Sequence, residues 1–290
     1  MPELPEVETL VRRLREPLVG RTIIHATVKW PRTIGRPALR EFVRRVRGLT
    51  IQAITRRAKY LVFKLGPPSS TAWQAHPERS AAQSKDAGEP PQFLLIHLKM
   101  SGKLSVVDRA APILKHDRVL FDLDNGQQLR FNDIRKFGRM HLVADPAAIT
   151  GALGPEPLER AFTLPQFRAL IKARSGAIKP LLLNQQFLAG VGNIYADEAL
   201  WYAKIHPRRK ADSLKDAEVT ALYRSIRRVL KRAIADHGTD AGDGVIEGDY
   251  QPRVYGREGR PCYRCHQPIH KIVVGQRGTH YCPRCARKRG

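Results

Sequence analysis

Cysteine is absent from the first 261 residues of this 290-residue chain, and all four cysteines lie near its end. Acidic residues are also scarce: 27 Asp and Glu face 51 Lys and Arg, which gives a formal net charge of +24. Apolar runs of about 18 residues are missing, so the sequence predicts no membrane-spanning helix. No apolar signal segment precedes the polar start, and we therefore expect a cytoplasmic protein with reduced thiols.

The positive charge is spread along the chain rather than confined to a tail. An excess of this kind favours binding to nucleic acid or to another extended polyanion. A basic protein of a membrane surface is the alternative, but the sequence has no basic amphipathic helix rich in Trp or Phe. In a bacterium such a protein would work in the cytoplasm, beside the chromosome.

The four cysteines form two CxxC pairs, Cys262-x2-Cys265 and Cys282-x2-Cys285, which are 16 residues apart. This spacing is typical of a structural site for one Zn²⁺ ion. Between the pairs, residues 272–281 predict two short strands around a turn that contains glycine. Residues 251–290 carry ten Lys or Arg and one Glu, so the predicted zinc hairpin is strongly basic. Two disulfides are the alternative, and they would require an oxidising compartment.

Apolar periodicity divides the rest of the chain into a β-rich part and a helical part. Residues 6–15 predict an amphipathic helix that Pro17 ends. Asp124-Asn125-Gly126 is a strong hairpin signal between two of the strands that follow. Short strands at this spacing are typical of a sandwich or a barrel. The predicted strands are 22–30, 50–57, 59–65, 93–98, 103–107, 118–123, 128–132 and 139–143.

Residues 66–92 interrupt the strands with a segment low in aliphatic residues, which we interpret as a flexible insertion. Beyond residue 146 the composition favours helices, and Gly190-Val191-Gly192-Asn193 lies in a turn before one of them. The predicted helices are 165–173, 178–184, 194–202 and 216–236. We therefore expect three domains: an N-terminal β-domain over 1–146, a helical domain over 147–250 and a zinc finger over 251–290.

The chain begins with Met1-Pro2-Glu3. If Met1 is removed, Pro2 becomes a secondary amine whose pKa, near 8, leaves part of it unprotonated at neutral pH. Such an amine attacks an aldehydic sugar carbon to give an iminium, and Glu3 could supply a proton to the leaving group. On this chemistry alone, a proline-rich start that caps the first helix is the simpler interpretation.

Six motifs, which occur in the family order, together resemble bacterial formamidopyrimidine-DNA glycosylase over nearly the whole chain. This resemblance favours a catalytic role for Pro2 and Glu3 over a simple helix cap. The first is the start, Pro2-Glu3-Leu4-Pro5-Glu6, and the last is the cysteine hairpin. The others are Arg57-Ala58-Lys59-Tyr60-Leu61, His97-Leu98-Lys99-Met100-Ser101-Gly102, Asp133-Ile134-Arg135-Lys136-Phe137-Gly138, and Ile178-Lys179-Pro180 followed by Gly190-Val191-Gly192-Asn193.

The resemblance implies an α+β multidomain fold: a β-sandwich with flanking helices, a helix-two-turns-helix element and a zinc finger, with DNA in the cleft between. It implies an enzyme that excises oxidised purines and nicks the resulting abasic site. In this interpretation Pro2 is the Schiff-base nucleophile and Glu3 is the acid. Lys59 takes part in proton transfer during β-elimination, and Arg277 binds phosphate and assists δ-elimination.

The resemblance also implies a set of residues that contact double-stranded DNA. Met100, Arg135 and Phe137 match the side chains that fill the gap left by a flipped nucleotide, which repair enzymes turn out of the duplex. The remaining contacts are assigned to His97, His116, Arg174, Lys179 and Asn193. Without the resemblance, Met100 has an ordinary interpretation as a core residue, Phe137 as a strand aromatic and Arg135 as a surface charge.

The chain departs from the family pattern in four places. Lys99 replaces the usual glycine, and Lys136 replaces the commoner arginine. The insertion at 66–92 is atypical, and the 238–254 loop is shorter than usual, which leaves the range of lesions open. Two alternatives remain: an endonuclease VIII-like glycosylase for oxidised pyrimidines, against which Leu4 argues, and a non-catalytic zinc protein that senses distorted DNA.

Overall fold

The computed structural model describes residues 1–68, 92–240 and 248–286, and they divide into two compact units. The first unit contains residues 1–2 and 10–151, and the second contains residues 3–9 and 152–290. The expected insertion at 66–92 falls largely outside the described residues, as does the middle of the 238–254 loop. The three-domain division stays a prediction.

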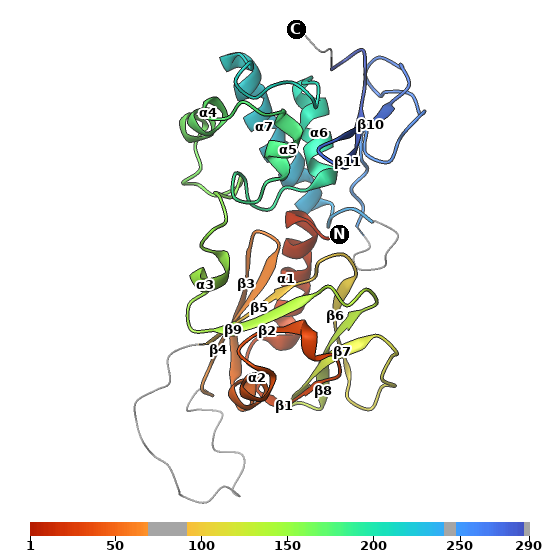
Figure 1. Ribbon diagram of the computed structural model, residues 1–290. Helices are drawn as coiled ribbons and strands as arrows, with labels where there is room; N and C mark the ends of the chain where they lie inside the picture. Colours follow the sequence, from red (N-terminus) through yellow and green to blue (C-terminus); the bar gives the residue numbers. More distant parts are fainter. Residues whose placement is uncertain (69–91, 241–247, 287–290) are drawn as a thin grey trace, which may run out of the picture. The chain divides into compact units, whose positions relative to one another are not determined.

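The first unit is built on two β-sheets (Figure 1). One sheet has the strand order β1-β7-β8-β6, and the other has the order β2-β9-β5-β4-β3. Neighbouring strands in these two sheets are antiparallel, except that β2 runs parallel to β9. The strands are β1 (Ile23–Val28), β2 (Ile34–Arg36), β3 (Thr50–Arg57), β4 (Tyr60–Gly66), β5 (Gln92–His97), β6 (Gly102–Asp108), β7 (Asp117–Leu123), β8 (Gln127–Asp133) and β9 (Arg139–Val143).

Consecutive apolar residues of the central strands form the core. In β7 and β8, for example, Val119, Phe121 and Phe131 are fully buried, and both faces of these strands are covered. The predicted hairpin is confirmed: Gly126, in the turn between β7 and β8, has φ +79°, a conformation that glycine adopts without steric cost. All eight predicted strands are present, with ends that differ by one or two residues.

Helix α1 (Leu4–Leu18) begins in the second unit and continues from Leu10 in the first. The other helices of the first unit are α2 (Leu39–Val46) and α3 (Ala147–Thr150), with a short 3₁₀ helix, η1 (Pro31–Thr33). The prediction that Pro17 ends α1 is wrong by one residue, because the helix continues to the fully buried Leu18. The sequence interpretation missed α2, which buries only Phe42 and Val46 and is too short for a clear periodic signal.

The second unit contains four helices and a hairpin among its described residues (Figure 1). They are α4 (Leu164–Lys172), α5 (Ile178–Leu183), α6 (Asn193–Ala203), α7 (Asp216–Ala235), β10 (His270–Val274) and β11 (Arg277–Tyr281). Helix α6 is the centre of this unit, because eight of its residues are buried. It contacts α5, α7 and β11.

No helix in the described part of the chain combines the length and the apolar character that crossing a membrane requires.

Candidate active site, DNA-contact residues and metal centre

The Glu3 carboxyl group is held at the start of α6. Its Oε2 accepts a hydrogen bond from the backbone N–H of Gly192 at 2.7 Å, and its Oε1 accepts one from Ile194 at 2.9 Å. Glu3 is only 2% exposed. The N-terminal turn of a helix leaves N–H groups free to bind such an acceptor. The loop before α6 therefore fixes both oxygens of the residue that follows Pro2.

Glycine at position 192 makes this approach possible. A Cβ atom built on Gly192 would lie 2.3 Å from Glu3 Cδ, far inside van der Waals contact. The φ of Gly192 is −132°, which other residues also adopt, so space rather than backbone conformation requires glycine here. The sequence placed this segment in a turn before a helix, but nothing in it identified Glu3 as the group that the turn holds.

Glu6 joins the same N-terminal segment to the 238–254 loop. Its Oε2 accepts the N–H of Glu3 at 2.8 Å, and its Oε1 accepts the N–H of Thr239 at 2.9 Å. The hydroxyl of Tyr195 also donates to Glu6 Oε1. Burial, followed by the Glu6 charge, raises the pKa of Tyr195 well above its ordinary value, so its hydroxyl keeps the proton that it donates.

Lys59 and His97 both belong to the first unit. Lys59 lies in the turn between β3 and β4 and is 5% exposed. His97 ends β5, and its ring packs edge-on against Tyr60 at a centroid separation of 4.7 Å. Burial, followed by the charges of nearby Lys99 and Lys59, lowers the pKa of His97 to about 3. His97 is therefore neutral at pH 7, and its Nδ1 accepts the N–H of Lys99 at 3.0 Å.

The three residues assigned to gap filling lie on two neighbouring loops of the first unit. Met100 is 41% exposed and Phe137 is 47% exposed, an unusual state for large apolar side chains. The Arg135 guanidinium lies 5.0 Å from the centre of the Phe137 ring. The structure thus presents an apolar chain, a guanidinium and a ring to solvent, although it contains no DNA that would test their role.

One buried carboxylate connects these two loops. Asp133, at the end of β8, is fully buried, and its Oδ1 accepts the hydroxyl of Ser101 at 2.5 Å and the N–H of Arg135 at 3.2 Å. Its Oδ2 accepts the N–H of Gly138 at 2.8 Å. The carboxylate therefore binds both ends of the Arg135–Phe137 loop as well as the residue after Met100. The sequence contained this aspartate in a motif without indicating its contacts.

The two lysines that depart from the family pattern both adopt left-handed backbone conformations. Lys99 has φ +56° and Lys136 has φ +60°. Glycine reaches this region at no steric cost, which is a physical reason for glycine to be usual at position 99. The Lys136 ammonium lies 4.1 Å from the centre of the Trp30 ring, a cation–π contact that offsets part of this cost.

Two further predicted DNA contacts lie at the surface of their units. His116 is half-buried before β7, where its Nδ1 lies 3.0 Å from an Arg118 nitrogen. Arg174 is exposed after α4. The structure contains no DNA, so these assignments stay predictions.

Lys179 and Asn193 instead face the hairpin of β10 and β11. Lys179 is fully buried, and its ammonium lies 2.6 Å from Asp197 Oδ1. It also donates to Thr279 Oγ1 at 2.8 Å and to the carbonyl of Gly278 at 3.0 Å. Burial lowers the pKa of Lys179 from its ordinary value, and Asp197 opposes that shift. The Asn193 amide donates to the same Gly278 carbonyl at 3.0 Å.

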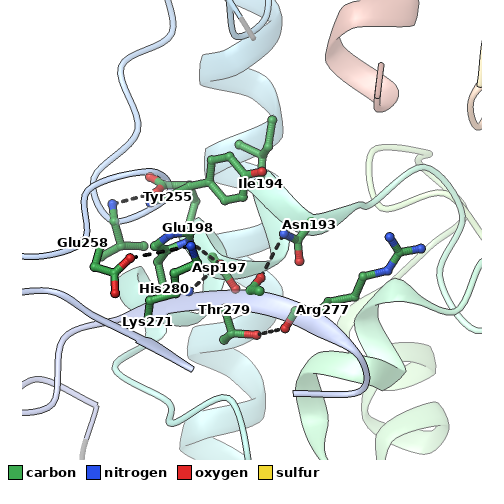
Figure 2. Close-up of polar contacts among 12 residues, drawn as sticks. Asn193, Ile194, Asp197, Glu198, Tyr255, Glu258, Lys271, Arg277, Thr279 and His280 are labelled. Carbon is green, nitrogen blue, oxygen red and sulfur yellow. Dashed lines mark hydrogen bonds and ion pairs between the residues drawn. The ribbon is translucent and has the colours of Figure 1, made fainter. Parts of the chain in front are cut away.

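Arg277 begins β11 and is exposed. Figure 2 shows its side chain extending away from the polar contacts around Asp197. An exposed guanidinium at a hairpin turn is suited to a phosphate, which it can bind in a bidentate manner.

The four cysteines are free thiols whose Sγ atoms all lie within 4.8 Å of one another. The Sγ atom of Cys265 lies 3.4 Å from those of both Cys282 and Cys285, and the Sγ atoms of Cys262 and Cys285 are 4.0 Å apart. Tetrahedral zinc with Zn–S bonds of about 2.3 Å places its sulfurs about 3.8 Å apart, so the four residues fit one structural zinc ion. The alternative of two disulfides is not seen. The ligands are Cys262, Cys265, Cys282 and Cys285.

Hydrogen bonds to the sulfurs extend this centre into α6. The indole N–H of Trp201 donates to Cys262 Sγ at 3.4 Å, as does the backbone N–H of Arg264. Trp201 also packs in one buried cluster with Val254 and Ile269. Such outer contacts orient metal ligands and favour their charged form.

Comparison with known families finds three models that match successive segments of the chain. The N-terminal domain of formamidopyrimidine-DNA glycosylase matches residues 1–140, and its H2TH domain matches residues 153–243. A zinc finger found in these enzymes and in isoleucyl-tRNA synthetase matches residues 259–287. The chain belongs to the formamidopyrimidine-DNA glycosylase family.

Relatives within the family match over their full length. Formamidopyrimidine-DNA glycosylase of Enterococcus faecalis is 43% identical over 300 residues, covering 100% of this chain and 99% of that protein. The enzyme of Herpetosiphon aurantiacus is 42% identical, covering 98% and 99% of the two chains. A solved Lactococcus lactis glycosylase with abasic-site DNA superposes with a TM-score of 0.85 at 36% identity, covering 99% and 100%. Another structure of that enzyme contains Fapy-dG DNA and also has a TM-score of 0.85, at 34% identity and the same coverage.

Two buried carboxylates on α6 were missed from the sequence. Asp197 pairs with Lys179, and Glu198 accepts hydrogen bonds from the N–H groups of Arg253, Val254 and Tyr255 at 2.7–3.0 Å. Burial raises the pKa of Glu198 despite these donors. Nothing in the sequence of α6 distinguishes these two residues from other acidic residues. Their role is recognised only from the residues that contact them in the folded chain.

Proposed function

We propose that this protein is a base-excision repair enzyme that removes oxidised purines, 8-oxoguanine and formamidopyrimidines, from duplex DNA and then cleaves the abasic strand. The family assignment supports a glycosylase with lyase activity, and the related Lactococcus lactis structures contain abasic-site and Fapy-dG DNA. The main support for this proposal is the position of Glu3, which follows Pro2 directly in the chain. The backbone N–H groups of Gly192 and Ile194 fix its carboxyl group.

The chemistry begins at the Pro2 nitrogen once Met1 has been removed. The secondary amine attacks C1′ of the damaged nucleotide, and the glycosidic C–N bond breaks. The base leaves with the bonding electrons and takes a proton supplied through Glu3. Opening of the sugar ring then gives an iminium between Pro2 and C1′. The glycosidic bond is exchanged for a covalent bond to the enzyme, and no oxidant or reductant is needed.

Two eliminations follow from this iminium. Loss of a proton from C2′ breaks the C3′–O bond, and the phosphate on that side leaves with the electron pair. Loss of a proton from C4′ then breaks the C5′–O bond and releases the second phosphate. We assign Lys59 to proton transfer and phosphate contact in the first elimination and Arg277 to the phosphate of the second. Water finally hydrolyses the imine and restores the amine.

The base must leave the helix before C1′ can be reached, which costs a few kcal/mol of stacking. We assign the exposed Met100, Arg135 and Phe137 to the gap, where Met100 and Phe137 replace lost stacking and Arg135 faces the orphaned cytosine. We assign His97, His116, Arg174 and Asn193 to DNA contacts elsewhere. The formal charge of +24 supports phosphate binding of this kind.

Zinc at the four cysteines supplies folding free energy to the finger rather than a chemical step. We also place the protein in the cytoplasm of a bacterium as a monomer beside the chromosome. Thiols that bind zinc need a reducing compartment, which supports this location.

Borohydride trapping tests the central step. The protein, with its N-terminus confirmed by mass spectrometry as Pro2, is mixed with abasic duplex DNA and reduced. Peptide mapping should find the DNA adduct on Pro2, because reduction converts the iminium into a stable amine. A protein that retains Met1 should give no adduct, since its Pro2 nitrogen is an amide.

Three outcomes would count against the proposal. An adduct on Lys59 alone, with Pro2→Gly fully active, would overturn the nucleophile. No adduct at all, together with tight binding to distorted duplex, would favour a non-catalytic zinc protein. Faster excision of oxidised pyrimidines than of 8-oxoguanine would favour an endonuclease VIII-like specificity.

A further inference from the structure

Arg277 can serve its proposed phosphate only if the backbone beneath it is fixed. The residue stands at the first position of β11, directly after the turn at Gly275 and Gln276. Its side chain is exposed, and Figure 2 shows it extending away from α6. A two-stranded hairpin alone is marginally stable in water, so it does not by itself hold such a position.

A buried polar cluster joins the residues next to Arg277 to α5 and α6. Asp197 and Lys179 form an ion pair at 2.6 Å, and both side chains are fully buried. Asp197 Oδ2 also accepts the backbone N–H of His280 at 2.8 Å. On the other side of the ion pair, the Lys179 ammonium donates to the Gly278 carbonyl and to the Thr279 hydroxyl.

Thr279 passes this connection to Arg277 itself. Its hydroxyl accepts from Lys179 and donates to the carbonyl oxygen of Arg277 at 2.9 Å. Thr279 is fully buried, so water cannot replace the bond that the hydroxyl makes. The carbonyls of Arg277 and Gly278 and the N–H of His280 are thus all held by buried side chains, as Figure 2 shows in part.

This cluster is separate from the zinc centre. The hydrogen bonds and the ion pair described above for Lys179, Asp197 and Thr279 involve no cysteine. Zinc retention can therefore be measured independently of the cluster. Gly275 gives the turn a second contact: a Cβ atom there would lie 2.7 Å from Pro180 Cγ, the residue after Lys179. The hairpin turn is therefore seated on α5 at two points.

We propose that Asp197, Lys179 and Thr279 are positioning residues for Arg277, and that Lys179 acts through the finger instead of touching a DNA phosphate. Its ammonium is surrounded by three protein partners and is fully buried. The inference rests on the proposed function, because it needs Arg277 to act in the second elimination.

The test measures the ratio of second- to first-elimination products on abasic duplex DNA. Thr279→Val keeps the shape of the side chain and removes the hydroxyl, whereas Thr279→Ser keeps the hydroxyl. We expect Thr279→Val to lower the ratio roughly tenfold, as misplacement of a reacting group commonly does, and Thr279→Ser to restore it. Asp197→Asn, a second isosteric change, should lower it in the same way.

A double-variant comparison separates positioning from a general loss of structure. In an Arg277→Ala background, Thr279→Val should change the ratio no further, because residues that act through one group are not additive. Thr220→Val is the matched control, since that hydroxyl donates to the Asp216 carbonyl and accepts from Arg168, and neither partner belongs to the hairpin. Zinc content and Pro2 trapping should stay at the wild-type level in Thr279→Val, Thr279→Ser and Thr220→Val.

Several results would overturn the inference. They are an unchanged ratio in both Thr279→Val and Asp197→Asn, an equal further loss in the Arg277→Ala background, failure of Thr279→Ser to restore the ratio, and loss of zinc in Thr279→Val. A wild-type protein that neither excises nor forms a Pro2 adduct would instead refute the proposed function, and trapping is therefore measured first.

Discussion

Replacing Gly192 by alanine places a methyl group against the Glu3 carboxyl group. The new Cβ would lie 2.3 Å from Cδ and 2.5 Å from Oε1 of Glu3. Carbon atoms in contact are normally about 3.5–4.0 Å apart, so one of the two groups must move by about 1 Å. Gly192 belongs to the backbone at the start of α6, and we therefore expect the side chain of Glu3 to move.

The size of the effect follows from that displacement. A misplacement of about 1 Å in a catalytic group can lower a rate by about 10²-fold. The carboxylate also loses two hydrogen bonds from N–H groups, each contributing about 1.5–3 kcal/mol because the acceptor is charged. Alanine also lowers the conformational entropy of the unfolded chain, which raises the free energy of unfolding by about 0.4–1 kcal/mol. We expect the free energy of unfolding to fall by about 2–5 kcal/mol.

Single-turnover kinetics on a duplex with one 8-oxoguanine give the excision rate, and a pre-formed abasic site gives the nicking rate. Gly192→Ala should lower excision about 100-fold and nicking less, because no base has to leave an abasic site. Gly176→Ala is the matched control: a Cβ there would have no neighbour within 4 Å. Adding Glu3→Gln to Gly192→Ala should cause little further loss, since both act on one carboxyl group.

The reasoning is refuted if Gly192→Ala excises 8-oxoguanine within a fewfold of the wild-type rate while remaining folded. It is also refuted if excision and nicking fall equally, because the defect would then lie outside the step that Glu3 serves.

Three further predictions concern other parts of the chain. Cys282→Ser should lose the zinc that metal analysis finds in the wild-type protein, and most DNA affinity with it, while the N-terminal unit stays folded; active protein without zinc would contradict this. Because the pKa of His97 is lowered to about 3, the folded protein does not take up the proton that the unfolded chain binds below about pH 6.5. The free energy of unfolding should therefore decrease as the pH is lowered from about 6.5 toward 3, by up to about 1.4 kcal/mol per pH unit. Denaturant titrations of His97→Gln should show a shallower fall, and an identical slope would exclude His97 as the cause. Ser101→Ala, which removes one bond to Asp133, should weaken insertion of the gap-filling residues, as followed by 2-aminopurine fluorescence opposite an abasic analogue. Exposed Ser105→Ala is its control, and equal signals from the two variants would contradict the role of Asp133.

The secondary-structure elements and the chemistry that is local in the chain could be predicted from the amino-acid sequence. The strands were predictable because short apolar segments are separated by turn signals, and helices α6 and α7 because their composition favours helix. The zinc ligands were predictable because a CxxC turn brings its two sulfurs together without help from the rest of the fold. Pro2 and Glu3 were assigned through the ordered motifs that supplied the family, because their local chemistry alone favours a simple helix cap.

Which distant groups hold those residues in place could be learned only from the packing of the folded chain. Glu3 meets Gly192 and Ile194 across about 190 positions of sequence, and Lys179 meets Thr279 across 100. Such pairs leave no periodic signal, because their partners are set by how helices and loops pack. The same limit explains why the family resemblance assigned Lys179 to a DNA phosphate without indicating its ion pair. A lysine is usually exposed, and only the folded structure places this one, fully buried, beside Asp197.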